Sequence, residues 1–322
     1  MSRQTLRQLA ERRGLLIGAA CSPGTIEAEA DYRRVLAREF NCIVAENGMK
    51  FMYLQPGFRQ FDFSEARRLV DFARRHRMKL RGHTLVWHNQ LPPWLKEGAW
   101  SRTQMLDILQ EHIFTVAGHF RDELFAWDVV NEALADSGGW REDSPWYKGI
   151  GPEYLERAFR WAHEAAPDAQ LFYNDYGMEL AGAKSDACHR LLARLLRKGV
   201  PLHGVGFQFH LGVENRLDRR ACIANIRRFN RLGLTASFTE LDMGIKKPIT
   251  PQGRQEQAHE YASRIRIALD APDVSAVLFW GFTDRHSWIP AFTKGEYDEG
   301  LPFDRNCRPK PACHAIARAL EE

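Results

Sequence analysis

The segment Trp127–Asp128–Val129–Val130–Asn131–Glu132 is an apolar, β-branched run that ends in an amide and a carboxylate. Apolar and β-branched residues favour a buried strand. Because burying a carboxylate is unfavourable unless it is paired or solvated, a strand that ends in Asn131 and Glu132 indicates a functional site at that end. A second strand-like run, residues 234–239, also ends in a glutamate, Glu240, with Asp242 two residues beyond it.

Strand-like runs of this kind alternate with helical segments along the whole chain. We expect strands at residues 15–20, 42–45, 79–84, 125–130, 170–173, 204–207, 234–239 and 274–279. We expect helices at residues 4–13, 27–39, 64–77 (with Ser64 as N-cap), 102–120, 152–165, 183–198, 218–231, 254–269 and 311–320. Eight such alternations predict an α/β protein, a single (β/α)8 TIM barrel over residues 1–322, with its active site at the carboxyl ends of the strands.

The composition is that of a soluble globular protein: 322 residues, 44% apolar and 27% charged, with a net charge of +4. The basic residues are scattered along the predicted helices rather than gathered in blocks, which disfavours nucleic-acid binding. No run of 18 apolar residues exists, so we expect no membrane span. These features favour a monomer whose partner is its substrate.

Two further features bear on the compartment. Six cysteines without any CxxC pair predict buried thiols rather than a disulfide scaffold or a metal site. The run Gly14–Cys21 after Arg12 and Arg13 imitates an export signal, but it is short and Glu11 precedes it, so we interpret it as the first barrel strand. As the sequence stands it predicts a cytoplasmic protein, whereas a leader ahead of residue 1 would make it secreted.

Two carboxyl groups at separate strand ends are what cleavage of a glycosidic bond requires. Either Glu132 or Glu240 alone could be a structural carboxylate, but as a pair they fit the reaction: one is protonated and gives its proton to the leaving oxygen, and the other is ionised and attacks the anomeric carbon. Asn131 can offer amide hydrogens to a sugar hydroxyl. His210 is expected to hydrogen-bond Glu240, with Asp242 orienting its imidazole.

Aromatic side chains in the loops after the strands form the second signal. Trp87, Trp280 and Trp288 lie in such loops, where an indole can stack on the apolar face of a sugar ring. The polar residues that follow the same group of strands include Glu46, Asn47, Lys50, His83 and Gln90. Flat aromatic rings among hydrogen-bond donors and acceptors suit an uncharged polysaccharide as the substrate. There is no glycine-rich phosphate loop and no histidine ligand cluster, so we expect neither a phosphate substrate, a metal nor any other cofactor.

Five ordered segments carry a resemblance to a known family. They are GHTLVWH (82–88), WDVVNEAL (127–134), LFYNDYG (171–177), FTELD (238–242) and FWGFTDRHSW (279–288). They resemble glycoside hydrolase family 10, the barrel endo-β-1,4-xylanases, and the similarity runs from about Leu15 to Leu320. It implies a retaining endo-hydrolase of the β-1,4-xylosidic bonds of xylan and xylo-oligosaccharides that acts by double displacement, with Glu240 as nucleophile and Glu132 as acid/base.

The resemblance also implies roles for the neighbouring residues. Asn131, His210 and Asp242 match residues that support the reacting sugar and the nucleophile. Glu46, Asn47, Lys50, His83, Trp87, Gln90, Gln208, Trp280 and Trp288 match the xylose-binding residues on the glycone side, and Asn174 and Tyr176 match positions near the acid/base and the aglycone. The chain departs from the family pattern at Ala45, Phe51 and Gly177, which affects expected subsite affinity rather than reaction type. A β-1,4-glucanase or a non-catalytic carbohydrate binder on the same barrel remains an alternative.

Overall fold

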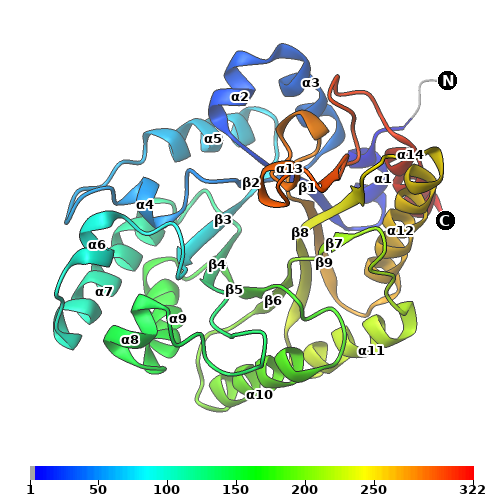
Figure 1. Cartoon of the computed structure of the whole chain (residues 1–322). Helices are drawn as coiled ribbons and strands as arrows, with labels where there is room; N and C mark the ends of the chain where they lie inside the picture. The colour runs from blue at the N-terminus through cyan, green and yellow to red at the C-terminus, as the bar shows by residue number, and fades with distance from the viewer. Residues whose placement is uncertain (1–3) are drawn as a thin grey trace.

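Eight parallel strands form a closed barrel in the computed structural model, which describes residues 4–322 (Figure 1). They are β1 (Leu16–Cys21), β2 (Cys42–Ala45), β3 (Lys79–Val86), β4 (Ala126–Asn131), β5 (Gln170–Asp175), β6 (Gly204–Phe207), β8 (Thr235–Lys246) and β9 (Val274–Phe279). Each pairs with its neighbour in this order, and β9 also pairs with β1, which closes the ring. The predicted (β/α)8 barrel is confirmed, and the segment that imitates an export signal is barrel strand β1.

Helices surround the barrel and return the chain from one strand to the next (Figure 1). The longer ones are α1 (Leu6–Arg12), α3 (Ala30–Glu39), α5 (Ser64–Arg75), α7 (Arg102–His119), α9 (Glu153–Ala165), α10 (Ala183–Arg197), α11 (Arg219–Asn230), α12 (Pro251–Asp270) and α14 (Pro311–Glu321). Short helices lie in the loops that follow β1, β2, β3, β4 and β9: α2 (Pro23–Ala28), α4 (Phe51–Leu54), α6 (Pro93–Glu97), α8 (Pro145–Ile150), η1 (Asp284–His286) and α13 (Ile289–Phe292). Among residues 4–322, no helix has both the length and the apolarity needed to cross a bilayer.

Strand β8 is longer than the predicted strand and carries two small additions at its carboxyl end. β7 (His210–Gly212) runs parallel to it with His210 opposite Asp242, and β10 (Tyr297–Asp298) runs antiparallel to it. The extended part of β8 begins just after residue 239, where the catalytic candidates lie. The additional pairing holds this strand end in a defined register.

Two expectations about helices are wrong. Residues 27–39 do not form one helix, because Glu29 is extended (φ −116°, ψ 104°) and separates α2 from α3. The break presents Glu29 and Asp31 to Arg285, whose Nη1 and Nη2 lie 2.6 and 2.7 Å from the two carboxylates. Ser64 is the first residue of α5 rather than its N-cap, and the Asp62 carboxylate accepts the Ser64 N–H at 2.8 Å.

The barrel interior changes from apolar to polar around the ring. Side chains from β1, β2, β9 and the residue after β9 form one buried apolar cluster: Ala20, Cys42, Val44, Ala276, Leu278 and Trp280. In β3 and β4, by contrast, Arg81 and Asp128 form a fully buried ion pair at 2.5 Å, and His83 contacts the second oxygen of Asp128 at 3.0 Å. A buried charge needs such partners. This polar ladder leads up the barrel toward the carboxyl ends of the strands. All six cysteines are buried, as expected.

Candidate active site

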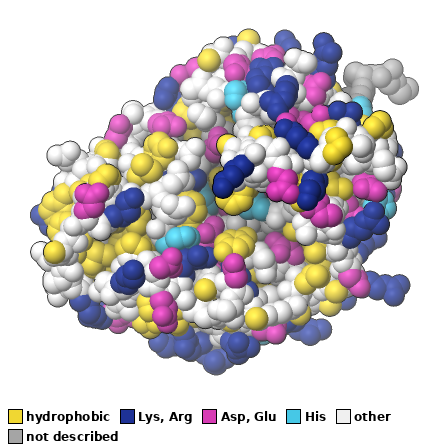
Figure 2. Space-filling view, in the orientation of Figure 1, with side chains coloured by type: hydrophobic (Ala, Val, Ile, Leu, Met, Phe, Trp, Pro, Cys, Tyr) yellow, Lys and Arg dark blue, Asp and Glu magenta, His cyan; other side chains and the backbone are white. Residues whose placement is uncertain are grey.

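All the predicted site residues lie at the carboxyl ends of the barrel strands or in the loops that follow them. Five of them belong to barrel strands: His83 to β3, Asn131 to β4, Asn174 to β5, and Glu240 and Asp242 to β8. His210 begins β7. The others follow a strand: Glu46, Asn47, Lys50, Trp87, Gln90, Glu132, Tyr176, Gln208, Trp280 and Trp288. Figure 2 shows this face hollowed near its centre, with histidine and acidic side chains around the hollow. The placement agrees with the general rule for such barrels.

Glu240 is buried among donors. Its Oε2 lies 3.0 Å from His210 Nε2, and its Oε1 accepts a 2.7 Å hydrogen bond from Asn174 Nδ2. His83 Nδ1 lies 4.0 Å from the same Oε1. Burial by itself would raise the pKa of Glu240, but the hydrogen bond from His210 and the charges of His83 and His210 lower it below the usual value. Glu240 is therefore held as a carboxylate.

His210 bridges two carboxylates. Its Nε2 faces Glu240 and its Nδ1 lies 3.0 Å from Asp242 Oδ2, as the sequence predicted, because the β7–β8 register sets His210 opposite Asp242. The same Asp242 oxygen accepts the Trp288 indole N–H at 2.6 Å. Burial opposes the imidazolium, yet the charge of Asp242 and hydrogen bonds to both carboxylates raise the pKa of His210 to about 10. A positive charge thus lies against Glu240 at neutral pH.

Glu132 has a different environment: its hydrogen-bond donors are neutral, and His88 Nδ1, 3.9 Å from its Oε2, belongs to an imidazole whose pKa burial lowers. Its Oε2 accepts the Trp87 indole N–H at 2.9 Å, and its Oε1 accepts amide hydrogens from Gln208 Nε2 (3.0 Å) and Asn131 Nδ2 (3.2 Å). Its side chain is 12% exposed, against 6% for Glu240. The backbone of Glu132 has φ +55°, a left-handed conformation that is uncommon for residues other than glycine and occurs often at functional sites.

Side-chain amides connect the two glutamates. Asn131 Oδ1 accepts from Asn174 Nδ2 at 2.9 Å and from Gln208 Nε2 at 3.2 Å. Since Asn174 also donates to Glu240 and Gln208 also donates to Glu132, one continuous hydrogen-bond network joins both carboxylates. The amide hydrogens of Asn131 point partly to Glu132, rather than only to substrate as the sequence suggested.

The residues expected on the glycone side gather around Lys50. Its Nζ donates to Asn47 Oδ1 at 3.1 Å and lies 5.1 and 5.5 Å from the ring centres of Trp87 and Trp280. Gln90 Nε2 donates to the same Asn47 oxygen at 3.1 Å. Burial lowers the pKa of Lys50, and the charges of Glu240, Glu46 and Glu132 oppose that change. Burial raises the pKa of Glu46, and the charge of Lys50 opposes this increase.

Tyr176 lies on the other side of Glu132, in a group of charged residues. Its hydroxyl accepts from Arg141 Nη2 at 3.0 Å, and Lys184 Nζ lies 3.3 Å from its ring centre. Arg141 Nε also donates to the backbone carbonyl of Glu132 at 2.9 Å. The loop that returns from Glu132 to Arg141 is thereby fastened to the strand end it leaves.

The positions that depart from the family pattern lie around the site rather than at the two glutamates. Ala45 is the buried last residue of β2. Phe51 is buried and stacks on His112, with 3.7 Å between ring centres and 13° between planes. Gly177 has φ +66°, which a residue with a side chain rarely adopts.

Four residues that build the site were not predicted from the sequence. Arg81 and Asp128 orient His83, Thr239 donates to Asn174 Oδ1 at 2.7 Å, and Arg141 holds the Glu132 carbonyl. A signal existed for the first pair, because a charged residue inside each of two buried strands requires a buried partner. For Thr239 and Arg141 the sequence offers no comparable signal, since their partners depend on strand register and loop path.

Comparison with known proteins agrees with this geometry. The model of glycosyl hydrolase family 10 matches residues 5–319. Endo-1,4-beta-xylanase B from Thermotoga neapolitana is 43% identical over 98% of this chain and 92% of its own length. Xylanase 10B from Thermotoga petrophila, solved with xylobiose, is 44% identical, superposes with a TM-score of 0.97, and is matched over 100% of this chain and 98% of that one. A protein named exoglucanase XynX, from Acetivibrio thermocellus, is 38% identical over 94% of this chain and 28% of its own length.

Because the family model and these relatives cover nearly the whole chain, the protein belongs to glycosyl hydrolase family 10.

Proposed function

We propose that the protein is an endo-1,4-β-xylanase that hydrolyses internal β-1,4-xylosidic bonds of xylan and xylo-oligosaccharides. Two similar proteins support the substrate: one is named endo-1,4-beta-xylanase, and another was solved with xylobiose. The site supports it as well, because indoles lie among amide donors and a lysine, with Lys50 near the rings of Trp87 and Trp280. A neutral pyranose ring offers an apolar face to such aromatics and hydroxyls to such polar groups.

The mechanism we propose is double displacement with retention of anomeric configuration. The Glu240 carboxylate attacks the anomeric carbon while the bond to the leaving oxygen breaks, and Glu132 gives its proton to that oxygen. Water then attacks the same carbon, Glu132 takes a proton from the water, and the Glu240–sugar bond breaks. This sequence returns both carboxyl groups to their initial protonation states.

The observation that carries this assignment is the difference between the two environments. Glu240 is buried against the His210 imidazole, whose pKa is about 10, and this favours an ionised nucleophile. Glu132 is bound by neutral N–H donors and is more exposed, which suits a group that changes its protonation state twice in each cycle. The hydrogen-bond network through the Asn131 amide supports the positions of the two carboxyl groups relative to each other.

Product stereochemistry tests the mechanism directly. Proton NMR of xylo-oligosaccharide hydrolysis, recorded in the first minutes, is expected to show β-configured reducing ends that mutarotate later. Early α-configured ends would contradict a covalent intermediate on Glu240. A Glu240→Gln preparation serves as the control for contaminating hydrolases, and its spectrum should show no new reducing ends.

A β-1,4-glucanase is the second candidate, because one similar protein is named exoglucanase. Xylose lacks the exocyclic CH2OH of glucose, so a crowded glycone pocket accepts xylobiosides and rejects cellobiosides. Turnover of aryl β-xylobioside and aryl β-cellobioside should be compared side by side, with a preference for the xylobioside expected. Binding of xylo-oligosaccharides without release of reducing ends would instead favour a non-catalytic carbohydrate binder.

A further inference from the structure

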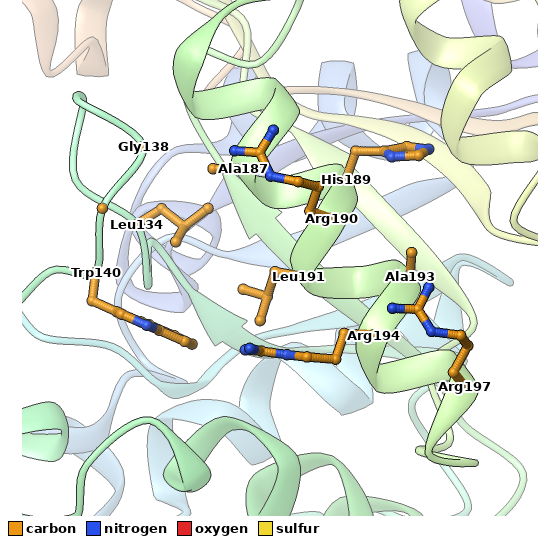
Figure 3. Close-up of a pocket in the computed structure, with 11 residues that line it drawn as sticks. Leu134, Gly138, Trp140, Ala187, His189, Arg190, Leu191, Ala193, Arg194 and Arg197 are labelled. Atoms are coloured by element: carbon orange, nitrogen blue, oxygen red, sulfur yellow. The ribbon is translucent and has the colours of Figure 1, made fainter.

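A pocket of about 630 Å³ lies away from the catalytic pair, between the loop that follows β4 and the outer helix α10 (Figure 3). The loop contributes Leu134, Gly138, Gly139 and Trp140; α10 contributes Ala187, His189, Arg190, Leu191, Ala193, Arg194 and Arg197. None of these lining residues carries a carboxylate. The mechanism proposed above makes no use of this pocket.

Three arginines form one wall of the pocket. Arg190, Arg194 and Arg197 are exposed and are spaced so that they share one face of α10. Within residues 4–322 none of the three side chains has an ion pair or a hydrogen bond, whereas Arg160 on α9 and Arg228 on α11 are paired with glutamate and aspartate. Like charges at this spacing destabilise a helix slightly, so their grouping without acidic partners favours an anionic ligand. Figure 2 shows basic side chains gathered along the lower edge of the molecule, over α10.

The opposite wall is aromatic and the floor is apolar. Trp140 is half-buried and packs against Tyr147, with 5.7 Å between ring centres, while Leu134 and Leu191 are buried. Figure 3 shows the side chains of Trp140 and Arg194 extending toward each other from the loop and from α10. An indole and two leucines provide surface for the apolar face of a sugar ring, and a guanidinium binds a carboxylate with two parallel hydrogen bonds.

The pocket and the catalytic site share the loop from residue 133 to residue 141. At one end of this loop Arg141 holds the Glu132 carbonyl, and in the middle Asp136 lies 3.4 Å from Lys184 of α10. Gly138 lies against the start of the same helix, where a Cβ would come within 2.6 Å of the Ala183 carbonyl oxygen. The loop that lines the pocket is therefore fastened at one end to the backbone of Glu132 and, through Asp136 and Gly138, to the start of α10.

We propose that this pocket binds the uronic acid substituents of acidic xylan. The arginines would hold the carboxylate and Trp140 the sugar ring, so that an acidic chain is bound more tightly than a neutral one. This inference rests on the proposed xylanase function and adds the charge class of the preferred substrate.

The test compares glucuronoxylan with the same polymer after its uronic acids have been reduced to neutral hexoses. For the natural protein we expect a KM about three- to tenfold lower on the acidic polymer, the range for a few exposed ion pairs, with little change in kcat. The preference should decrease at high salt, because exposed charges are screened. The combined variant Arg190→Gln, Arg194→Gln and Arg197→Gln should lose the preference and keep its activity on carboxyl-reduced xylan.

A matched control removes arginines from another exposed surface. Arg13→Gln, Arg34→Gln and Arg75→Gln together remove the same three charges far from the pocket, just after α1 and on α3 and α5, and should keep the full preference for acidic xylan. If this control loses the preference as well, the effect is one of overall charge and the inference fails. Thermal unfolding of both variants checks that the helices are intact.

The remaining outcomes separate this inference from the proposed function. If the protein hydrolyses carboxyl-reduced xylan and shows no preference for the acidic polymer, the proposed binding of uronic acids in the pocket is refuted. The xylanase proposal then stays in place. No hydrolysis of either polymer refutes the xylanase proposal. Binding of the natural protein to single-stranded DNA or heparin that the arginine variant loses, without any acidic-xylan preference, would assign the arginines to another polyanion and overturn the inference.

Discussion

Glu132 and Glu240 stand at equivalent places, each at the carboxyl end of a barrel strand, yet their surroundings differ in charge. Glu240 is bound by the His210 imidazole, which Asp242 keeps protonated, and by one amide. Glu132 is bound by an indole and two amides, all neutral, and its own backbone is left-handed. The fold thus supplies two similar positions, and their hydrogen-bond partners set them apart: a protonated imidazole at Glu240 and neutral N–H groups at Glu132.

The greatest loss of activity is expected from removing Glu240, the carboxylate beside the His210 imidazolium. Glu240→Ala should lower kcat/KM on xylo-oligosaccharides by at least about 10⁴-fold, as when the nucleophile of a covalent mechanism is deleted. Azide should restore turnover of an aryl xylobioside by attacking from the side that Glu240 vacates, and the product should have inverted configuration. Rescue with inversion in Glu132→Ala, but not in Glu240→Ala, would reverse the two assignments.

Removing the other carboxylate should have a smaller effect that depends on the leaving group. Glu132→Ala should lower kcat/KM at least about 100-fold on substrates with poor leaving groups, the lower range for general acid catalysis. An activated aryl glycoside needs no protonation, so its first step should be nearly unaffected. Rates measured over a series of aryl leaving groups check this, and equal losses across the series would remove Glu132 from the role of acid.

Loss of a single neutral hydrogen-bond donor to Glu132 should lower the activity less. Trp87→Phe removes the N–H that Glu132 Oε2 accepts and keeps an aromatic surface beside Lys50. One hydrogen bond of this kind contributes about 0.5–1.5 kcal/mol, so kcat/KM should fall roughly two- to tenfold. Steady-state kinetics on xylotetraose measure the change. A loss of several hundredfold would mean that the indole does more than donate to Glu132.

The smallest effect concerns titration rather than rate. Nitrogen NMR of the imidazole should show His210 protonated up to about pH 10, and in Asp242→Asn its pKa should fall well below 10, because the charge of Asp242 is the largest cause of the increase. A group with a raised pKa stabilises the fold fully below its unfolded pKa of about 6.5, and this contribution is lost as pH rises through the folded pKa.

Unfolding measurements give a second readout of the same pair. Relative to His210→Gln, the natural protein should lose free energy of unfolding between about pH 6.5 and pH 10. A difference between the two proteins that does not change with pH in this window would contradict a charged His210.

The sequence predicted the parts of the molecule that depend on local pattern. The alternation of apolar runs and helices gave the barrel, and the polar residues after each strand gave the catalytic face. Even the Glu240–His210–Asp242 chain was foreseen, because adjacent strand ends bring these residues together. The break at Glu29 was not foreseen, because its partner Arg285 lies at the far end of the chain and local pattern does not show this contact.

Which side chains face one another is set by the folded structure and not by local pattern. The Arg81–Asp128–His83 ladder follows from the β3–β4 register, and the arginine-lined pocket follows from where one loop meets α10. The local pattern of apolar residues indicates where strands lie and where they end, so the two glutamates at strand ends could be found from the sequence. Contacts across strands depend on strand register and loop path, so the neutral partners of Glu132 became visible only in the folded barrel, whereas His210 beside Glu240 was expected from the sequence.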